Sequence, residues 1–470
     1  MKTKTTFLTD WQHKRVYVAP DNPPGRALAV ALEEAGATVL GRLDNLKKGD
    51  GIINHPHQAE DFDAIVIATS DYQQAIADGV VEKGFSRNKI FRQTSADPIN
   101  IQPVKHTGRV ASSLQKLGNT ASRLLSRVPK SYIVYFAENY ADTNVLVAFD
   151  YHHQRSNNVV LLVKNARQTS HPAQVSHPWA VLFYLIRARV IVVDHEFSDR
   201  TFNRLRQTTP VLQLWHGLPF KHLAGNKHFQ HVKDRAFISS SHWFNTHIFP
   251  GIFTANEYLA LGYPRNDALL QLRDERCWRN AVHPESMDKF VGANKLIIYM
   301  PTYRDDGNNH YPIDWKALDA LLQQLGAVCL VKTHPFLSPS ESLTLLEGCA
   351  RVATYPGRQN IYPWLAEASL LITDYSSVAL DFLLTDKPVI HFCYDMAHYT
   401  SMRGQFLLPA DAFMVGAKVE NQDALFQEIT LALSHDCYQQ HRAALRGRYG
   451  LTSNLACPQI IDYVDAVVKV

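Results

Sequence analysis

The sequence lacks the short motifs that identify several large enzyme classes. It contains no GxSxG segment, no Walker loop and no HExxH. These absences argue against a serine hydrolase of the α/β type, a P-loop nucleotide hydrolase and a zinc peptidase. The one DxD motif, Asp61 and Asp63, precedes an apolar run near the N-terminus, far in sequence from the other polar clusters. We therefore expect no metal site and no cofactor.

Cysteine pairs and long apolar runs are also missing. The six cysteines form no CxxC pair, and several lie in apolar runs, so reduced thiols in a cytoplasmic protein are expected. Residues 1–15 lack the apolar core of a signal peptide. The best candidate for a membrane-spanning run, residues 180–194, is interrupted by Arg187 and Arg189. We expect a cytoplasmic location, with at most peripheral contact to the inner face of the plasma membrane.

Charge and composition describe a globular chain with more than one domain. The 470 residues are 46% hydrophobic and 20% charged, and a chain of this length exceeds a single core. The formal net charge of +4 is too small to indicate nucleic acid as a partner.

Residues 1–100 predict a small α/β module. A strand at 15–19, a helix ended by Gly36 and a strand at 63–72 alternate there. No GxGxxG segment marks a dinucleotide site, so a docking or scaffolding role is favoured, with ligand binding as the alternative.

Residues 101–130 predict a basic amphipathic helical linker. Between residues 104 and 130 the chain has six Lys or Arg and no Asp or Glu, and its apolar residues follow helical spacing. Such a helix can lie on an anionic membrane surface, or it can pack its apolar stripe on the next domain.

Two further sets of alternating strands and helices follow, at 131–250 and 251–470. This alternation predicts two doubly wound domains with parallel sheets, whose ligands bind at the carboxyl ends of the strands. Four polar clusters fall at predicted strand ends and favour one shared cleft. They contain His216 with Gly217, Thr302 with Arg304, Lys332 with His334, and Asp374 with Ser376 and Ser377.

Each cluster has a chemical and a structural interpretation. Ser376 and Ser377 can cap a helix or bind phosphate. Arg304 can hold a diphosphate by paired hydrogen bonds or form a surface ion pair. A neutral His216 can accept a proton from a hydroxyl nucleophile, or it can be a core histidine packed on Trp215.

In residues 131–450 the chain resembles the CDP-glycerol glycerophosphotransferase family of teichoic-acid and capsule polymerases, which have a GT-B-like architecture. The resemblance lies in segments that occur in this order: ENYADTN, QLWHGLPFKHL, LGYPRND, YMPTYRDD, THP, ITDYSSVALDFLLTDKPVIHF and the pair Arg403–Gly404. It implies an α/β fold of two Rossmann-like GT-B domains, with residues 131–250 as the acceptor domain and residues 251–470 as the CDP-donor domain with closing helices.

The resemblance also implies roles for individual residues. His216 would be the general base and His334 a second catalytic residue. The donor would be bound by Thr302, Arg304, Lys332, His334, Asp374, Ser376 and Ser377. The acceptor and the cleft would involve Gly217, Lys221, Arg265, Asn266 and Asp267.

The implied reaction moves glycerol phosphate or ribitol phosphate from a CDP-activated donor to a hydroxyl of a lipid-linked or polymer acceptor, and releases CMP without a metal. Such a reaction belongs to capsule or teichoic-acid-like polymer synthesis. Two alternatives remain, a GT-B glycosyltransferase that uses a nucleotide sugar and a catalytically silent binding module of capsule assembly.

Overall fold

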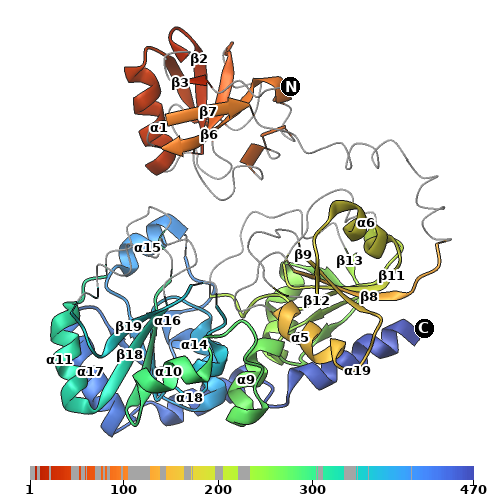
Figure 1. Cartoon of the computed structure of the whole chain (residues 1–470). Coiled ribbons are helices and arrows are strands. Elements are labelled where there is room, and N and C mark those ends of the chain that lie inside the picture. The colour runs from red at the N-terminus through yellow and green to blue at the C-terminus, as the bar shows by residue number, and fades with distance from the viewer. Residues whose placement is uncertain are drawn as a thin grey trace. The chain divides into compact units, whose positions relative to one another are not determined.

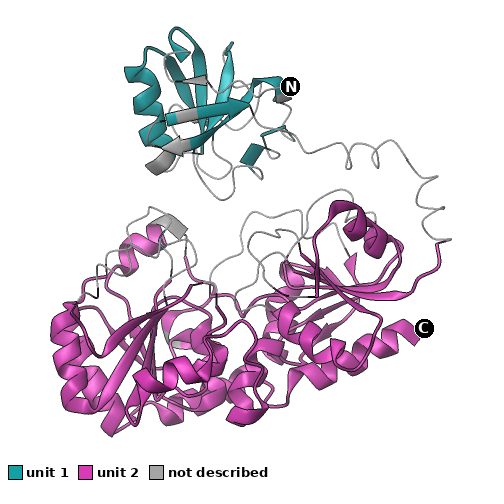
Figure 2. Cartoon of the chain, in the orientation of Figure 1, with its two compact units in different colours: residues 1–113, 304–309 teal, residues 114–303, 310–470 magenta. Residues whose placement is uncertain are grey.

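The computed structural model contains three separate main β-sheets and divides into two compact units (Figures 1 and 2). Residues 1–113 and 304–309 form one unit, and residues 114–303 and 310–470 form the other. The structure describes residues 6–7, 11–20, 23–43, 52–53, 59, 61–68, 76–77, 80–81, 85–96, 99–103, 128–137, 144–163, 171, 173–195, 205–220, 233–302, 304, 311–332, 346, 348–357, 359–403 and 405–469. The linker predicted at 101–130 therefore lies largely outside the described residues.

The N-terminal unit is built on a seven-stranded sheet in the order β1-β7-β6-β5-β2-β3-β4. Strands β2 to β6 are parallel, and β7 and β1 add an antiparallel edge. The predicted strand, helix, strand series is present as β2, α1, β3 and β5. The elements are β1 (Thr6–Phe7), β2 (Arg15–Ala19), α1 (Pro23–Glu34), β3 (Thr38–Leu43), β4 (Ile52–Ile53), β5 (Ala64–Ile67), β6 (Ile90–Ala96) and β7 (Ile99–Pro103).

The second unit begins with a lobe, called here the first lobe, around a parallel sheet in the order β10-β9-β8-β11-β12-β14-β16. The strands are β8 (Tyr132–Ala137), β9 (Val159–Val163), β10 (Gln174–Val175), β11 (Ala188–Val193), β12 (Val211–Gln213), β14 (Ala236–Ile238) and β16 (Tyr258–Leu259). Helices α5 (Asn144–His153), α6 (Pro178–Ile186) and α8 (His242–His247) connect them, with a small pair β13 (Lys233–Asp234) and β15 (Thr254–Ala255). Near-continuous apolar strands such as ARVIVV are typical of a parallel sheet covered on both faces.

The second lobe has a parallel sheet in the order β19-β18-β17-β20-β21-β22. Its strands are β17 (Lys295–Met300), β18 (Ala327–Lys332), β19 (Val352–Tyr355), β20 (Leu370–Thr373), β21 (Val389–Phe392) and β22 (Ala417–Val419). Its helices are α9 (Asp267–Leu270), α10 (Pro284–Val291), α11 (Trp315–Leu325), α13 (Tyr362–Leu365), α14 (Val378–Phe382), α15 (Met396–Arg403), α16 (Ala410–Phe413), α17 (Gln422–Ser434) and α18 (Gln439–Tyr449).

Local sequence signals explain where several of these helices begin and end. The carboxylate of Asp314 accepts hydrogen bonds from the N–H groups of Lys316 and Ala317 and caps α11, and Gly326, with φ +58°, ends it. Asn421 caps α17 through the N–H of Ala424. The order of the elements in both lobes alternates between strands and helices, which confirms the predicted alternation.

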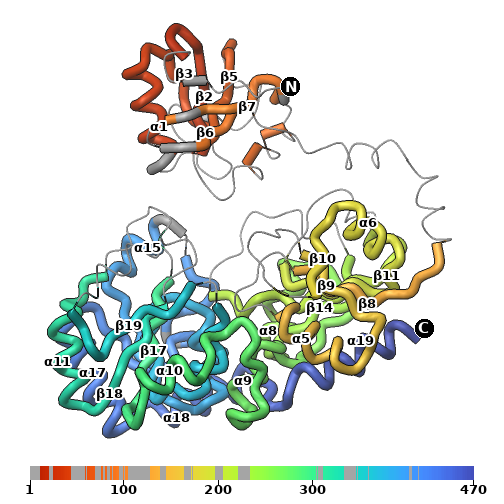
Figure 3. The backbone as a smooth tube through the Cα atoms, in the orientation of Figure 1, coloured from red at the N-terminus to blue at the C-terminus, as the bar shows by residue number. Residues whose placement is uncertain are grey.

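The last helix, α19 (Ala456–Lys469), returns to the first lobe and lies beside α5 (Figure 3). Ile460, Ile461 and Val464 pack in the same buried cluster as Ile133 and Tyr135 of β8. The first lobe thus takes β16 and α19 from beyond residue 250, the boundary that the sequence predicted.

Candidate active site

Parallel strands bring distant polar residues to one level at the sheet edges. In the first lobe Val193 of β11 is paired with Gln213 of β12, so Asp194 and the turn that carries His216 follow side by side. In the second lobe Met300 of β17 is paired with Thr373 of β20, so Thr302 and Asp374 follow at the same edge. Residues that follow the carboxyl ends of neighbouring parallel strands therefore lie together, as the sequence predicted.

His216 lies in a tight turn after β12. Trp215 before it has φ 50°, which is rare for a large side chain, and Gly217 after it has φ +139°. Nδ1 of His216 lies 3.1 Å from the backbone oxygen of Asp194. Because a carbonyl oxygen only accepts, Nδ1 carries the proton, and the tautomer leaves Nε2 as the basic nitrogen.

The surroundings of His216 keep this imidazole neutral. Desolvation by the surrounding protein, with the nearby His195 ring, lowers the pKa of His216 from 6.5 to about 3, although Asp194 opposes the shift. The residue as a whole is exposed to solvent. A neutral His216 at neutral pH can accept a proton.

Gly217 brings the two lobes into close contact. A Cβ atom at this position would lie 2.8 Å from Oγ of Ser377 and 3.1 Å from Nη2 of Arg265. The His216 turn of the first lobe is thus adjacent to Ser377, the residue directly before α14 in the second lobe. Glycine is required here both by its φ angle and by the space available.

We expect Gly217→Ala to lower activity at least about 10-fold and to destabilise the protein by about 1–3 kcal/mol, because the methyl group would displace Ser377 or Arg265. Thermal unfolding and product release would measure both effects. Gly326→Ala is the matched control: its φ is +58° and no described heavy atom lies within 4 Å of the added Cβ. Equal activity loss in both variants would contradict the crowding at Gly217.

Asp381 on α14 holds the interface between the lobes together. Its carboxylate, 1% exposed, accepts hydrogen bonds from Nη2 of Arg265 (2.7 Å), Nδ2 of Asn266 (3.0 Å) and the hydroxyl of Tyr362 (2.7 Å). Arg265 and Asn266, both predicted to build the cleft, are therefore bound to α14, the helix that follows Ser377.

Asn144, the first residue of α5, connects this network to the His216 turn. Its Nδ2 donates to the backbone oxygen of Trp215 (2.7 Å), and its Oδ1 accepts from the backbone N–H of Arg265 (3.2 Å). It is fully buried. Asn144 thus fixes the backbone on both sides of the lobe interface.

Asp374 organises the end of β20. Its carboxylate, 1% exposed, accepts from the backbone N–H of Thr302 (2.9 and 3.0 Å) and from that of Tyr375 (2.6 Å). The Thr302 hydroxyl also donates to it. These contacts orient Thr302 and Tyr375, and the donor-binding role of Asp374 stays a prediction.

Ser376 and Ser377 follow directly and are half-buried. Oγ of Ser376 accepts from the N–H of Val378 at 3.4 Å, and no side-chain cap bond from Ser377 is recorded at α14. Oγ of Ser377 lies close to Gly217, and the phosphate-binding role predicted for both serines stays a prediction.

The remaining predicted residues differ in their surroundings. Nζ of Lys332 donates to the backbone oxygens of Gly357 (3.1 Å) and Gln359 (3.0 Å), which is a structural contact. Arg304 is 4% exposed. His334 and Lys221 lie outside the described residues. The donor and acceptor roles of these four residues stay predictions.

Asp267, predicted to line the cleft, caps α19. Its carboxylate accepts from the backbone N–H groups of Ala456 (2.6 Å) and Cys457 (2.9 Å). Burial outweighs these bonds and raises the pKa of Asp267 from 3.8 to about 6. Its observed contacts anchor the C-terminal helix.

Because the pKa of Asp267 is raised, the direction in which the free energy of unfolding changes with pH can be predicted. The folded state binds this proton more tightly than the unfolded chain, so the free energy of unfolding falls as pH rises from about 4 to about 6, by about 3 kcal/mol in all from this group. Urea denaturation across this window should show a weaker decline for Asp267→Asn than for the native chain. A steeper decline in the variant would mean that the helix dipole lowers the pKa instead.

The sequence interpretation assigned no individual role to Asp194, His195, Asn144 and Asp381. Asp194 and His195 directly follow the apolar run of β11, so the strand-end rule could have found them. Asn144 and Asp381 lie inside quoted motifs, but their partners are distant in sequence.

We also searched the described residues for metal-binding groups and membrane-spanning helices. Among them no group of three or more His, Cys, Asp or Glu side chains is arranged to hold a metal ion. No helix within the described ranges is long and apolar enough to cross a bilayer.

Two parallel α/β lobes, with a neutral histidine on one and a hydroxyl-lined strand end on the other, define a transferase of GT-B-like architecture. The family of CDP-glycerol:poly(glycerophosphate) glycerophosphotransferases matches residues 120–450, well over half of the chain. The chain belongs to this family. The predicted family and its transferase class are thereby confirmed.

Relatives and a solved structure agree with this assignment. A teichoic acid glycerol-phosphate transferase of Staphylococcus aureus is 26% identical over 66% of this chain and 86% of its own length. The ribitol-phosphate polymerase TarK of the same organism is 26% identical, over 55% of this chain and 52% of that protein. The wall teichoic acid polymerase TagF is 21% identical and shares the fold, with a TM-score of 0.60 over 78% of this chain and 99% of that chain. The chain spans 31% of a related poly(glycerol phosphate) polymerase of Staphylococcus epidermidis.

Proposed function

We propose that this protein transfers glycerol phosphate or ribitol phosphate from a CDP-activated donor to a hydroxyl of a polymer or lipid-linked acceptor, and releases CMP. The observation that carries the proposal is the contact at Gly217, which sets the His216 turn of the first lobe against Ser377 of the second lobe. A base and a phosphate-binding strand end must be adjacent for such a transfer.

In the proposed reaction Nε2 of His216 accepts the proton of the acceptor hydroxyl. The oxygen then forms a bond to the phosphorus next to the polyol, and the bond from that phosphorus to CMP breaks. In this proposal the hydroxyls of Ser376 and Ser377 donate to the phosphate oxygens, while the N–H and the hydroxyl of Thr302 are held by Asp374. The negative charge of a bound diphosphate raises the pKa of His216 from its low value, so it becomes a better base when the donor is present.

The relatives do not choose between the two polyols. Some are named for glycerol phosphate and others for ribitol phosphate, at similar identity. A variant of TagF has been solved after soaking with CDPG, and that observation belongs to TagF. Both CDP-glycerol and CDP-ribitol are therefore donors to test here.

The test is CMP release from each donor by the purified full chain, with a short polyol-phosphate acceptor and with EDTA present. We expect release from one of the two donors, dependent on the acceptor and unaffected by EDTA. Release only without EDTA would contradict a metal-independent reaction. Turnover of a nucleotide sugar, with neither CDP-polyol used, would favour a glycosyltransferase.

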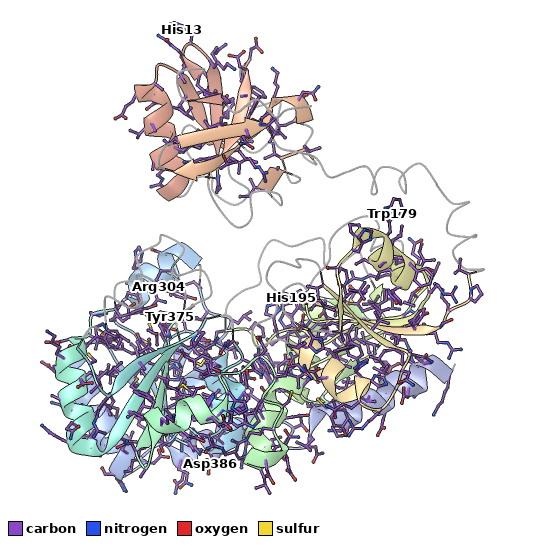
Figure 4. The ribbon with its side chains drawn as sticks, in the orientation of Figure 1. His13, Trp179, His195, Arg304, Tyr375 and Asp386 are labelled. Carbon is purple, nitrogen blue, oxygen red and sulfur yellow. The ribbon has the colours of Figure 1, made fainter. Side chains whose placement is uncertain are left out.

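We also propose that the first lobe meets an anionic lipid surface through α6. This helix, PWAVLFYLI, has no charged residue, and its Trp179 and Phe183 are 66% and 47% exposed. Figure 4 labels Trp179 on α6. The exposed Arg189 and the half-buried Arg187 follow it directly. Exposed aromatic side chains beside cationic groups suit the headgroup region of a bilayer.

We expect the double variant Trp179→Ser, Phe183→Ser to lose at least half of the binding to vesicles that contain anionic lipid, because two inserted aromatic side chains are removed. Vesicle flotation measures the bound fraction. Leu272→Ser is the control, since Leu272 is 70% exposed and lies after α9 in the second lobe. Unchanged flotation of the double variant would exclude α6 and leave residues 104–130 as the predicted membrane segment.

A further inference from the structure

We infer that Gln213 is a positioning residue: its side-chain amide holds the backbone of Trp215 in a left-handed conformation and so sets the place and the tautomer of the His216 ring. The inference rests on the proposed function, because it explains how the base of that reaction is placed. Gln213 is the last residue of β12, and the sequence predicted no role for it. Its amide contacts the backbone that follows two neighbouring strands.

Gln213 is a polar side chain at a fully buried position of a parallel sheet. A buried amide costs free energy unless its donor and its acceptor are both paired. Oε1 of Gln213 accepts from the backbone N–H of Trp215 at 2.9 Å, and Nε2 donates to the backbone oxygen of His195 at 3.3 Å. Because one partner can only donate and the other can only accept, these contacts fix which way round the amide lies.

Trp215 is the strained residue of the His216 turn. Its φ of 50° lies in the left-handed region, which is an outlier for so large a side chain. The N–H of Leu214 still donates to the neighbouring strand β11, at 2.7 Å. At the next residue side chains hold the backbone: Gln213 accepts from the N–H of Trp215, and Nδ2 of the fully buried Asn144 donates to its C=O at 2.7 Å. Two buried amides thus fix both backbone polar groups of the one strained residue.

The conformation of Trp215 determines where the imidazole of His216 lies. The two rings are in contact, with centroids 3.9 Å apart, and Nδ1 of His216 donates to the backbone oxygen of Asp194 at 3.1 Å. Gln213 bonds the next carbonyl along the chain, that of His195. Gln213 therefore holds the His216 turn and the end of β11 against each other. The hydrogen bond that selects the tautomer of His216 depends on both.

The alternative is that Gln213 serves only the stability of the sheet, and the two roles make opposite predictions for an acid at this position. Gln213→Glu keeps an oxygen that can accept from the N–H of Trp215, but it buries a carboxyl group, so it should be the less stable variant. Gln213→Met keeps the length of the side chain and loses both hydrogen bonds. If Gln213 positions the base, the more stable Met variant is the less active one.

The test measures CMP release by the full chain with a short polyol-phosphate acceptor and with CDP-glycerol or CDP-ribitol, whichever the native chain uses. We expect Gln213→Met to lower kcat about 10- to 100-fold, the loss that a displaced catalytic group causes, and to change the Kd of the donor less than about threefold. Gln213→Glu should retain at least about threefold more activity than Gln213→Met, because it keeps the hydrogen bond to Trp215.

Asn245→Leu is the control for the loss of a buried amide. Asn245 on α8 of the same lobe is 4% exposed, and its Oδ1 accepts from the hydroxyl of Ser239 at 2.7 Å. This variant should lose stability, as Gln213→Met does, and release CMP at the native rate. An equal activity loss in both variants would overturn the inference.

A second measurement does not depend on the reaction. Nitrogen NMR of isotope-labelled histidine reports the tautomer of His216, whose signal is identified by its absence in His216→Asn. We expect the Nδ1–H form at neutral pH in the native chain and in Gln213→Glu, and a shift toward the Nε2–H form in Gln213→Met.

Native kcat with an unchanged His216 signal in Gln213→Met would overturn the inference, and so would a lower activity of Gln213→Glu than of Gln213→Met. If Gln213→Met does not fold, the tautomer in Gln213→Glu decides, and loss of the Nδ1–H form in that folded variant would contradict the positioning role. If the native chain releases no CMP but the His216 signal moves as expected, the proposed reaction is wrong and the positioning role stands.

Discussion

His216→Asn should lower CMP release about 100- to 10,000-fold, the contribution that a general base makes. The Asn side chain can place an N–H near the position of Nδ1 and so keep the hydrogen bond to the backbone oxygen of Asp194. It removes only Nε2, the basic nitrogen. We therefore expect the affinity for the CDP-activated donor, measured by calorimetry, to change less than about threefold.

His247→Asn is the matched control for this substitution. Nδ1 of His247 also bonds a backbone oxygen, that of Trp243 at 2.9 Å, and its ring stacks on the Trp243 side chain. His247 is exposed on α8, with no proposed chemical role. CMP release at the native rate by His216→Asn, or an equal loss in His247→Asn, would remove His216 from the role of base.

Asp381→Ala should have the largest effect on stability. The ion pair of Asp381 and Arg265 has side chains 1% and 8% exposed, and removal of the carboxylate leaves a buried guanidinium without its counter-charge. Such a change costs about 3–5 kcal/mol. Urea unfolding followed by tryptophan fluorescence would measure it.

Asp381→Ala should also lower CMP release. Arg265, which lies close to Gly217, loses the carboxylate that orients it in this variant. Tyr362→Phe is the comparison, because it removes a single hydrogen bond to the same carboxylate and should cost about 1 kcal/mol. A similar small cost in both variants would show that Asp381 contributes through hydrogen bonding alone.

Local patterns in the sequence predicted the parallel sheets and the place of His216. Apolar runs ending in polar clusters are visible one strand at a time, and the rule that ligands bind at strand ends then groups Thr302, Asp374 and Ser376. The Nδ1 tautomer of His216 was not predictable, since it depends on Asp194, 22 residues away.

Contacts between distant segments explain what the sequence did not reveal. Asn144 bonds residues 71 and 121 positions away, and Asp381 bonds Arg265 across 116 positions. Asp267 was placed in the cleft by its motif, but its carboxylate caps a helix 189 residues later. A single sequence shows which residues are polar and does not show which of them meet.

The return of α19 to the first lobe bears on how the chain is made. Ile460 and Val464 complete a buried cluster that begins with Ile133, so during synthesis this lobe has an open hydrophobic surface until α19 has left the ribosome. The second lobe, whose strands lie between residues 295 and 419, can close earlier. The first lobe is therefore expected to become native after the second lobe, and to need protection from aggregation for longer.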